Sequence, residues 1–201
     1  MKRSTATARR SAALLLGTAL VALGATACNT TGASVSTEAK QPAAAAPSGA
    51  GSAAAGSGKQ AAGAAKVGDT IALKGFDKGS TADVTVVKVV DNAEGEDEFT
   101  KPADGKRFVA VQFRIRATGA KAYSDAPANS AKLLDGQGQS FGPSFFDTKA
   151  GQGFSGAVTI APGESGLGFL TFEVPKDTRL EKVQFTLDSG MADQTGQWKL
   201  S

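Results

Sequence analysis

The residue with the clearest chemistry is Cys28, the only cysteine of the chain. A basic start and an uncharged, mostly apolar run at residues 12–23 precede it, and a tract rich in Ala, Gly and Ser follows it. A basic start, a short apolar segment and small residues at the exit are typical of a secretory signal. A helix over 12–23 would rise about 18 Å, too little to cross a hydrocarbon core of about 30 Å. We therefore expect residues 1–27 to be a signal peptide.

Thr26 and Ala27, directly before Cys28, resemble the lipobox of bacterial lipoproteins. In that family the cysteine thiol is diacylated and the chain is then cut just before it. The alternative is ordinary cleavage after the A-x-A pattern of Ala25, Thr26 and Ala27, which would leave an unpaired thiol on a secreted protein. We favour lipidation of Cys28, because an unpaired extracellular thiol is a liability. Two acyl chains would hold the protein on the membrane, whereas one chain binds only reversibly.

A second group that could do chemistry is an acidic run after a predicted strand. It consists of Asp91, Glu94, Glu96, Asp97 and Glu98. Calcium binds several carboxylate and carbonyl oxygens, so the run is a candidate metal site. It lacks the spacing of a known calcium loop, and a solvated acidic connection between two strands is the interpretation we favour.

A third group is aromatic and lies in a loop rich in glycine. Phe141, Phe145 and Phe146 occur there, and Tyr123 lies in another long connection. Aromatic side chains on such loops can form a recognition surface. They can also cover one end of the fold as a small satellite core, and the sequence leaves both alternatives open, with the cover favoured.

Composition excludes several functions. The chain has no histidine, which rules out Ser-His-Asp catalysis and histidine-based zinc sites, and with one cysteine it has no internal disulfide. An enzyme would need paired carboxylates such as Glu164 and Glu173, which nothing in the sequence brings together. Removing residues 1–27 removes four of 22 basic residues and no acid, leaving 18 against 19 acidic residues, a net charge of −1. We therefore expect a protein that is not an enzyme, uses no cofactor and does not bind nucleic acid.

The elements that must position these residues follow a low-complexity tract. Residues 28–65, Cys28 and the tract after it, read as a disordered tether, because so few large apolar residues cannot offset the entropy of ordering. At full extension the tether would span about 130 Å and lift a domain off the membrane. Residues 66–201 remain as one domain.

That domain has the period of strands. In residues 107–116, the apolar residues Val109, Val111, Phe113 and Ile115 alternate with more polar ones, which predicts a strand with one buried face. No segment has a sustained helical period. Further strands are predicted at 70–73, 84–90 (with a bulge or both faces covered), 131–134, 139–141, 154–160, 170–174, 183–187 and 197–200. Short strands with turns about every ten residues predict an immunoglobulin-like antiparallel β-sandwich.

Several segments in this order resemble a bacterial family, the domain-of-unknown-function family 4352. They are residues 67–70, 84–86, 105–111, 134–138, 161–164 and 168–175. The resemblance covers about 67–188. It implies an immunoglobulin-like sandwich similar to a mycobacterial secreted immunogenic antigen, commonly carried by lipoproteins with a low-complexity tether. It implies no activity and no active-site residues.

These observations favour a lipoprotein anchored through lipid on Cys28 to the extracytoplasmic face of the bacterial membrane. Its domain would be a non-enzymatic module that binds a protein or an envelope component. The alternative is an extracytoplasmic protein that binds a small ligand or a metal ion such as calcium.

Overall fold

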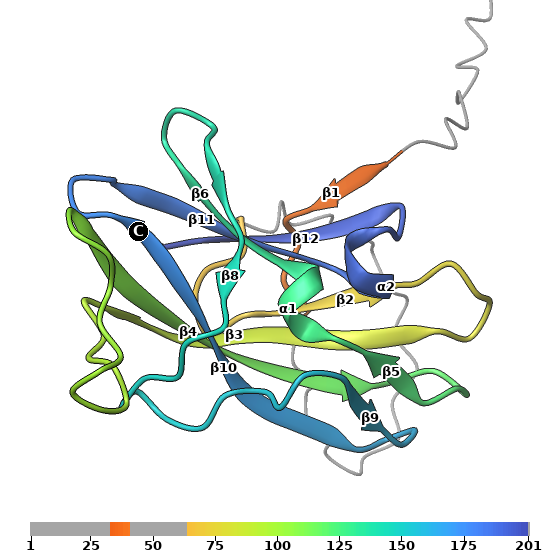
Figure 1. The fold of residues 1–201 in the computed structure, drawn as a ribbon. Coiled ribbons are helices and arrows are strands. Elements are labelled where there is room, and N and C mark those ends of the chain that lie inside the picture. Colours follow the sequence, from red (N-terminus) through yellow and green to blue (C-terminus); the bar gives the residue numbers. More distant parts are fainter. Residues whose placement is uncertain (1–32, 41–63, 201) are drawn as a thin grey trace, which may run out of the picture. The chain divides into compact units, whose positions relative to one another are not determined.

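The computed structural model describes residues 33–40 and 64–200, which form a β-sandwich (Figure 1). Residues 1–27, which were predicted to be a signal peptide, and Cys28 lie outside the described residues. The first sheet runs in the order β2 (Thr70–Lys74), β3 (Thr81–Asp91), β4 (Lys106–Ala117), β10 (Ser165–Pro175) and β8 (Pro143–Ser144). The second runs β1 (Ser34–Ser36), β12 (Gln194–Lys199), β11 (Leu180–Thr186), β6 (Ala131–Asp135) and β7 (Ser140–Phe141). The expected fold class, an immunoglobulin-like antiparallel β-sandwich, is confirmed.

Smaller elements complete the described part of the chain. β5 (Tyr123–Asp125) and β9 (Val158–Ile160) pair antiparallel. α1 (Pro127–Ser130) and α2 (Leu187–Gly190) are single turns. In the ranges that the structure describes, no helix is long and apolar enough to span a membrane.

The core lies between the two sheets, and the alternation in β4 places it there. Val109, Val111, Phe113 and Ile115 are all fully buried, as the sequence predicts. Trp198 of β12 is also fully buried, and its indole N–H donates to the Asp69 carbonyl at 2.9 Å. This bond joins the edge of the second sheet to the start of the first.

The outer face of β4 differs from the prediction at one end. Ala110 was predicted on the solvated face, but it is fully buried, as is Phe108 in the same phase of the strand. They form a satellite core with Ala93 and Phe169, beneath the loops that follow β3 and β8. In β3 a register shift between Val86 and Lys88 marks a bulge, which is one of the two explanations that the mixed pattern left open.

The expected tether differs from the structure where the two can be compared. Residues 33–40 are not a free chain, because β1 pairs in parallel with β12, with Ser34 opposite Gln194 and Ser36 opposite Gly196. Backbone pairing and one ion pair offset the small apolar area that this segment buries. Residues 41–63 lie outside the described ranges.

Candidate interaction surface

Two loops meet at one end of the first sheet. The loop at residues 92–105 joins β3 to β4, and the loop at 145–157 follows β8. The Glu96 amide donates to the Asp147 carbonyl at 3.1 Å, and the Lys149 amide donates to the Glu94 carbonyl at 2.9 Å. The Lys149 ammonium also lies 3.1 Å from the Glu94 carboxylate. Backbone bonds thus hold the two loops together as one surface.

Three phenylalanines on these loops differ in how far their side chains are exposed to solvent. Phe146 is 44% exposed and packs against the buried Phe108, with ring centroids 5.3 Å apart. Phe145 is 100% exposed and Phe99 is 85% exposed. Phe146 therefore covers the satellite core, which is one of the two alternatives left open by the sequence, whereas Phe145 and Phe99 face solvent. We call Phe99, Phe145, Phe146 and the acidic residues 94–98 the loop surface.

The acidic loop owes its conformation to local bonds. One carboxylate oxygen of Asp97 accepts the amides of Phe99 and Thr100 at 2.9 and 2.7 Å, an Asx-type turn. Hydrogen bonds from Thr100 hold the pKa of Asp97 below its ordinary value. A Cβ on Gly95 would lie 1.7 Å from the Thr100 carbonyl oxygen, so the loop closes only around glycine. The exposed position of Phe99 is thus built into the loop.

A hollow of about 160 Å³ lies beside the exposed rings. Its lining includes Phe145, Phe146, Thr148 and Phe169. The Thr148 hydroxyl is buried and finds no hydrogen-bond partner within the residues described. A buried polar atom without a partner is destabilising, so this hydroxyl is a local cost of the way the loop packs.

The acidic residues proposed for calcium do not converge. Over residues 33–40 and 64–200, no three His, Cys, Asp or Glu side chains are grouped to hold a metal ion. Glu94 pairs with Lys149, Asp97 caps its own turn, and Asp91 bonds the Arg107 guanidinium at 2.6 Å. Glu96 and Glu98 are exposed on the same loop. In the described residues, the acidic run therefore has the character of a solvated acidic connection, the interpretation favoured from the sequence, more than that of a metal site.

Tyr123 and Phe141 do not belong to the loop surface. Tyr123 is 7% exposed and lies in the main core, where burial, more than any other cause, raises the pKa of its phenol. Its hydroxyl has no hydrogen-bond partner in the described part of the chain. Phe141 of β7 is half-buried against the same core. Both were candidates for a binding surface, but their rings pack in or against the core of the sandwich.

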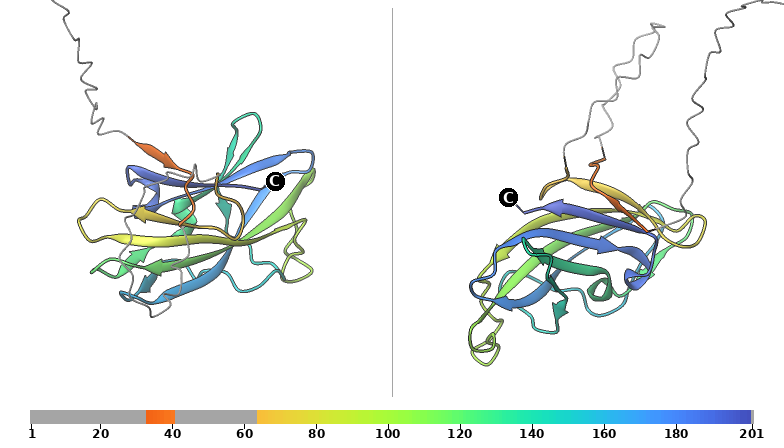
Figure 2. Two further views of the ribbon diagram at one scale, coloured as in Figure 1. Left: turned by 180° about the vertical axis from the view of Figure 1, so that it is seen from behind. Right: turned by 90° about the horizontal axis from the view of Figure 1, so that it is seen from above.

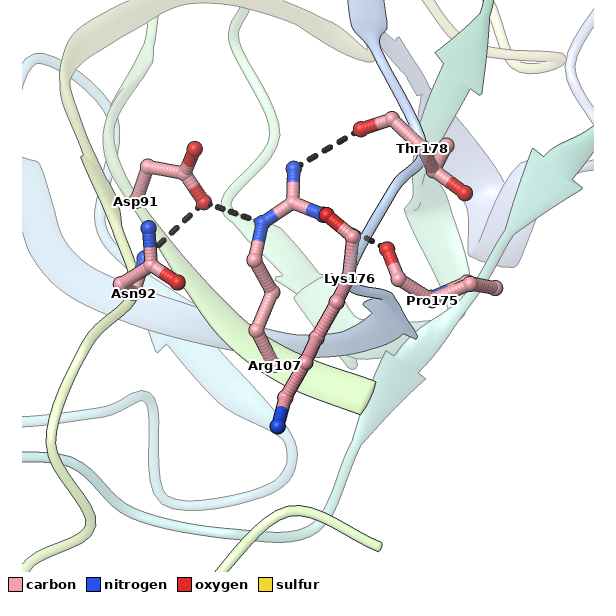
Figure 3. A network of polar contacts seen from close by, with 6 residues as sticks. All are labelled: Asp91, Asn92, Arg107, Pro175, Lys176 and Thr178. Atoms are coloured by element: carbon pink, nitrogen blue, oxygen red, sulfur yellow. Dashed lines mark hydrogen bonds and ion pairs between the residues drawn. The ribbon is translucent and has the colours of Figure 1, made fainter. Parts of the chain in front are cut away.

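Nothing in the sequence pattern predicted the network around Arg107 (Figure 3). Arg107 is in phase with the buried Val109 and Val111 of β4, and its side chain is itself buried. Its Nη1 donates to the carbonyls of Pro175 and Lys176 at 2.6 and 2.8 Å, and its Nη2 donates to Thr178 at 2.9 Å. The network fastens the β10–β11 turn to β4, which is a structural task.

The carboxylates required by the enzymatic alternative lie far apart. Glu164 precedes β10, whereas Glu173 lies near its end, nine residues or about 30 Å along the strand. Glu173 accepts the Ala103 amide at 2.7 Å and pairs with Lys106 at 3.0 Å. These two acids therefore share no site.

Comparison with known proteins gives matches of sequence and fold. The family described as "Domain of unknown function (DUF4352)" matches residues 77–195. The "putative lipoprotein (ycdA)" of Bacillus subtilis is similar in structure with a TM-score of 0.50 at 16% identity, covering 68% of this chain and 39% of that one. The chain thus spans about two fifths of that protein, and the likeness shows the fold alone.

Two smaller proteins are matched over nearly their whole length. MPT63, a secreted protein of Mycobacterium tuberculosis, has a TM-score of 0.47 at 16% identity, covering 67% of this chain and 94% of its own. The yjhA protein of Bacillus subtilis has a TM-score of 0.48 at 17% identity, covering 68% and 99% respectively. Comparison with the curated proteins gave no match.

Proposed function

Because the chain belongs to the DUF4352 family, whose description assigns no activity, we propose a function from the chain's own residues. The protein is a lipoprotein held on the extracytoplasmic face of a bacterial membrane through Cys28. Its sandwich is a non-enzymatic module that binds a protein partner through the loop surface. The observation that carries the binding role is the full exposure of Phe145 on a loop fixed by backbone bonds.

The anchor rests on the sequence before the domain. A basic start, a short apolar run and small residues before the only cysteine fit export followed by diacylation. The printed name of the ycdA protein and the secretion of MPT63 agree with an extracytoplasmic place. The test is the mass of the N-terminal peptide from the native membrane fraction. A diacylated Cys28 supports the anchor, and a free N-terminal Cys28 on a released protein overturns it.

The partner's chemistry follows from the charge of the loop surface. Residues 92–105 carry five acids, Glu94, Glu96, Asp97, Glu98 and Asp104, against the single base Lys101. An anionic lipid surface would be repelled by this loop, although it would accept the phenylalanines. A protein that offers an apolar pocket ringed by lysine or arginine would bind both the rings and the acids. We therefore favour a basic protein partner over the membrane.

Phe76 provides a matched control. It is 59% exposed and lies in the loop before β3, whereas Phe99 follows the same strand. β3 runs from Thr81 to Asp91, about 33 Å, so Phe76 and Phe99 lie at opposite ends of the sandwich (Figure 1). A photoactivatable phenylalanine is placed at position 145 or at position 76 of the anchored protein in its native envelope.

The expected result is one defined protein crosslinked from position 145 and not from position 76. That protein, once purified, should bind the domain, lose binding to the Phe145→Ser variant and bind more weakly as salt is raised. Phe76→Ser should bind normally. Crosslinks to lipid alone, or equal products from both positions, would overturn the assignment of the loop surface.

A further inference from the structure

Residues 33–40, which we call the strap, lie along the side of the sandwich where β12 of the second sheet and β2 of the first approach each other (Figure 2). The Ser34 amide donates to the Asp193 carbonyl at 2.6 Å, just before β12. The Lys40 amide donates to the Thr70 carbonyl of β2, also at 2.6 Å. The strap therefore runs from the edge of one sheet to the edge of the other.

The chain returns to the same edge after residues 41–63. The Ala65 amide donates to the Thr37 carbonyl at 2.7 Å, and the Lys199 amide of β12 donates to the Ala65 carbonyl at 2.8 Å. Ala65 is fully buried. The domain therefore begins firmly at Ala65, and the strap is an additional piece held beside it.

One ion pair fastens the end of the strap. Lys40 Nζ lies 2.5 Å from the Asp83 carboxylate, whose side chain is only 10% exposed. Asp83 lies in β3 between Ala72 of β2 and Arg116 of β4, well inside the first sheet. Lys40 is the one cation found paired with Asp83 among the residues described. The nearly buried Asp83 carboxylate is thus a binding site on the first sheet for the Lys40 ammonium.

The strap has little else to hold it. Val35 is exposed, and Ala39 is the only strap residue packed against the core. Hydrogen bonds and a half-exposed ion pair contribute little net stability, and segments with few buried apolar contacts open locally before the rest of a fold. The strap is therefore suited to leave the domain while the sandwich stays folded.

We propose that the strap is a detachable strand that sets how far the domain stands from the membrane. This inference rests on the anchor at Cys28 proposed above. With the strap docked, six residue steps from Cys28 to Ser34 span at most about 20 Å. With it released, the chain from Cys28 to Ala64 spans at most about 125 Å. Docking holds the domain close to the lipid, and release allows the loop surface to reach much further.

Docking also sets orientation. The strap enters beside Asp193, and the neighbouring Gln194 side chain accepts the Lys74 amide at 3.0 Å, at the end of β2 where β3 begins. The loop surface follows the other end of β3 (Figure 1). When the strap is docked, the sandwich is therefore tethered to the membrane at its end opposite Phe99. The loop surface then faces away from the lipid.

The test uses the chain from Cys28 onward, which keeps every residue that the structure describes. The single thiol is coupled to a maleimide lipid in vesicles that contain a dansyl lipid. Trp198, the only tryptophan, lies in β12 beside the strap and serves as the energy donor. Hydrogen exchange at Ser34 and Lys40 reports docking in the same samples.

The release variant combines Ser34→Pro, which removes the amide bonded to Asp193, with Lys40→Glu, which faces Asp83 with a like charge. The matched control is Lys78→Glu, the same charge change on the exposed β2–β3 loop. A thermal melt of each variant establishes that the sandwich is folded.

The wild type and the control should protect the amides of residues 34, 40 and 65, the last of which bonds the Thr37 carbonyl of the strap, and should transfer energy to the membrane. The release variant has no amide at position 34, because proline lacks it. It should lose protection at positions 40 and 65 and should lose the energy transfer. Rapid exchange at Ser34 and Lys40 in the wild type would overturn docking. Lost protection with unchanged transfer would overturn control of distance. Because the lipid is attached chemically, neither result depends on whether cells acylate Cys28, which the peptide mass decides separately.

Discussion

Phe113 of β4 and Phe185 of β11 meet between the two sheets, with ring centroids 5.3 Å apart and ring planes at 48°. Both rings are fully buried. Such tilted pairs contribute beyond the area they bury. With no internal disulfide to join the sheets, this contact is a main link between them.

Phe113→Ala should lower the free energy of unfolding by about 3–5 kcal/mol, because it removes a buried ring and leaves a cavity. Urea denaturation followed by the fluorescence of Trp198 measures the loss. Phe145→Ala removes an identical but fully exposed ring and should change stability by less than about 0.5 kcal/mol. Equal losses for the two variants would mean that the strand faces are assigned wrongly.

Arg107→Met should cost about 2–4 kcal/mol, since it leaves the carbonyls of Pro175, Lys176 and Thr178 without their charged donor. Arg107→Lys should recover only part of this loss, because an ammonium cannot reproduce the planar set of donors. Arg114→Met on the exposed face of the same strand is the control. If chemical denaturation finds Arg107→Met as stable as Arg114→Met, the Arg107 network does not contribute to the stability of the fold.

The alternation of residues 107–116 was enough to predict β4 and its buried face. Apolar residues at every second position indicate a strand with one face on the core. The alternation did not predict that Phe108 would be buried on the other face. That burial depends on loops which fold back from residues 93 and 146, and local pattern holds no information on such distant contacts.

For the candidate sites too, the sequence predicted local features but not contacts between distant segments. Sequence chemistry identified both loops of the loop surface, but it predicted neither their contact nor a role for Phe99. Tyr123 could not be placed from its position in a long connection, because its burial depends on the pairing of β5 with the distant β9. The strap was predicted to be part of the disordered tether. Only three of its residues pair with β12, and those three show no hydrophobic alternation.

Glu173 should make stability depend on pH. The Ala103 amide and the Lys106 ammonium hold the pKa of this carboxyl below its ordinary value of 4.5. Because the folded pKa is lower than the unfolded one, the carboxylate stabilises the fold above about pH 4.5. This contribution is lost as the pH falls through the folded value.

Glu173→Gln should therefore be less stable than the wild type at pH 7, and the difference should shrink in acid below the folded pKa. Glu164→Gln, the same change on an exposed turn, should show little difference at either pH. Denaturation curves at several pH values test this. A gap between wild type and Glu173→Gln that stays constant with pH would contradict the assigned cause.

Calcium should not change the stability of the domain. Asp91, Glu94 and Asp97 already bond Arg107, Lys149 and backbone amides, so a cation would have to displace these partners. Thermal melts in millimolar calcium and in EDTA should have the same midpoint. A higher midpoint in calcium would show that the acidic loop rearranges to bind it, and would restore the ion-binding alternative.

Gly95→Ala should separate the two loops of the loop surface without touching an aromatic ring. Its Cβ would lie 1.7 Å from the Thr100 carbonyl oxygen, so the backbone of the acidic loop must move. We expect faster hydrogen exchange at the Glu96 and Lys149 amides, which bridge the loops, and a lower crosslinking yield from position 145. The main core lies elsewhere, so the midpoint of global unfolding should change much less than in Phe113→Ala.

Gly142→Ala is the matched control, because a Cβ there meets nothing within 4 Å. It should leave both exchange rates and crosslinking as they are in the wild type. If Gly95→Ala accelerates exchange while the crosslinking yield from position 145 persists, then Phe145 binds its partner without the acidic loop. The partner would then need an apolar pocket but no ring of basic side chains.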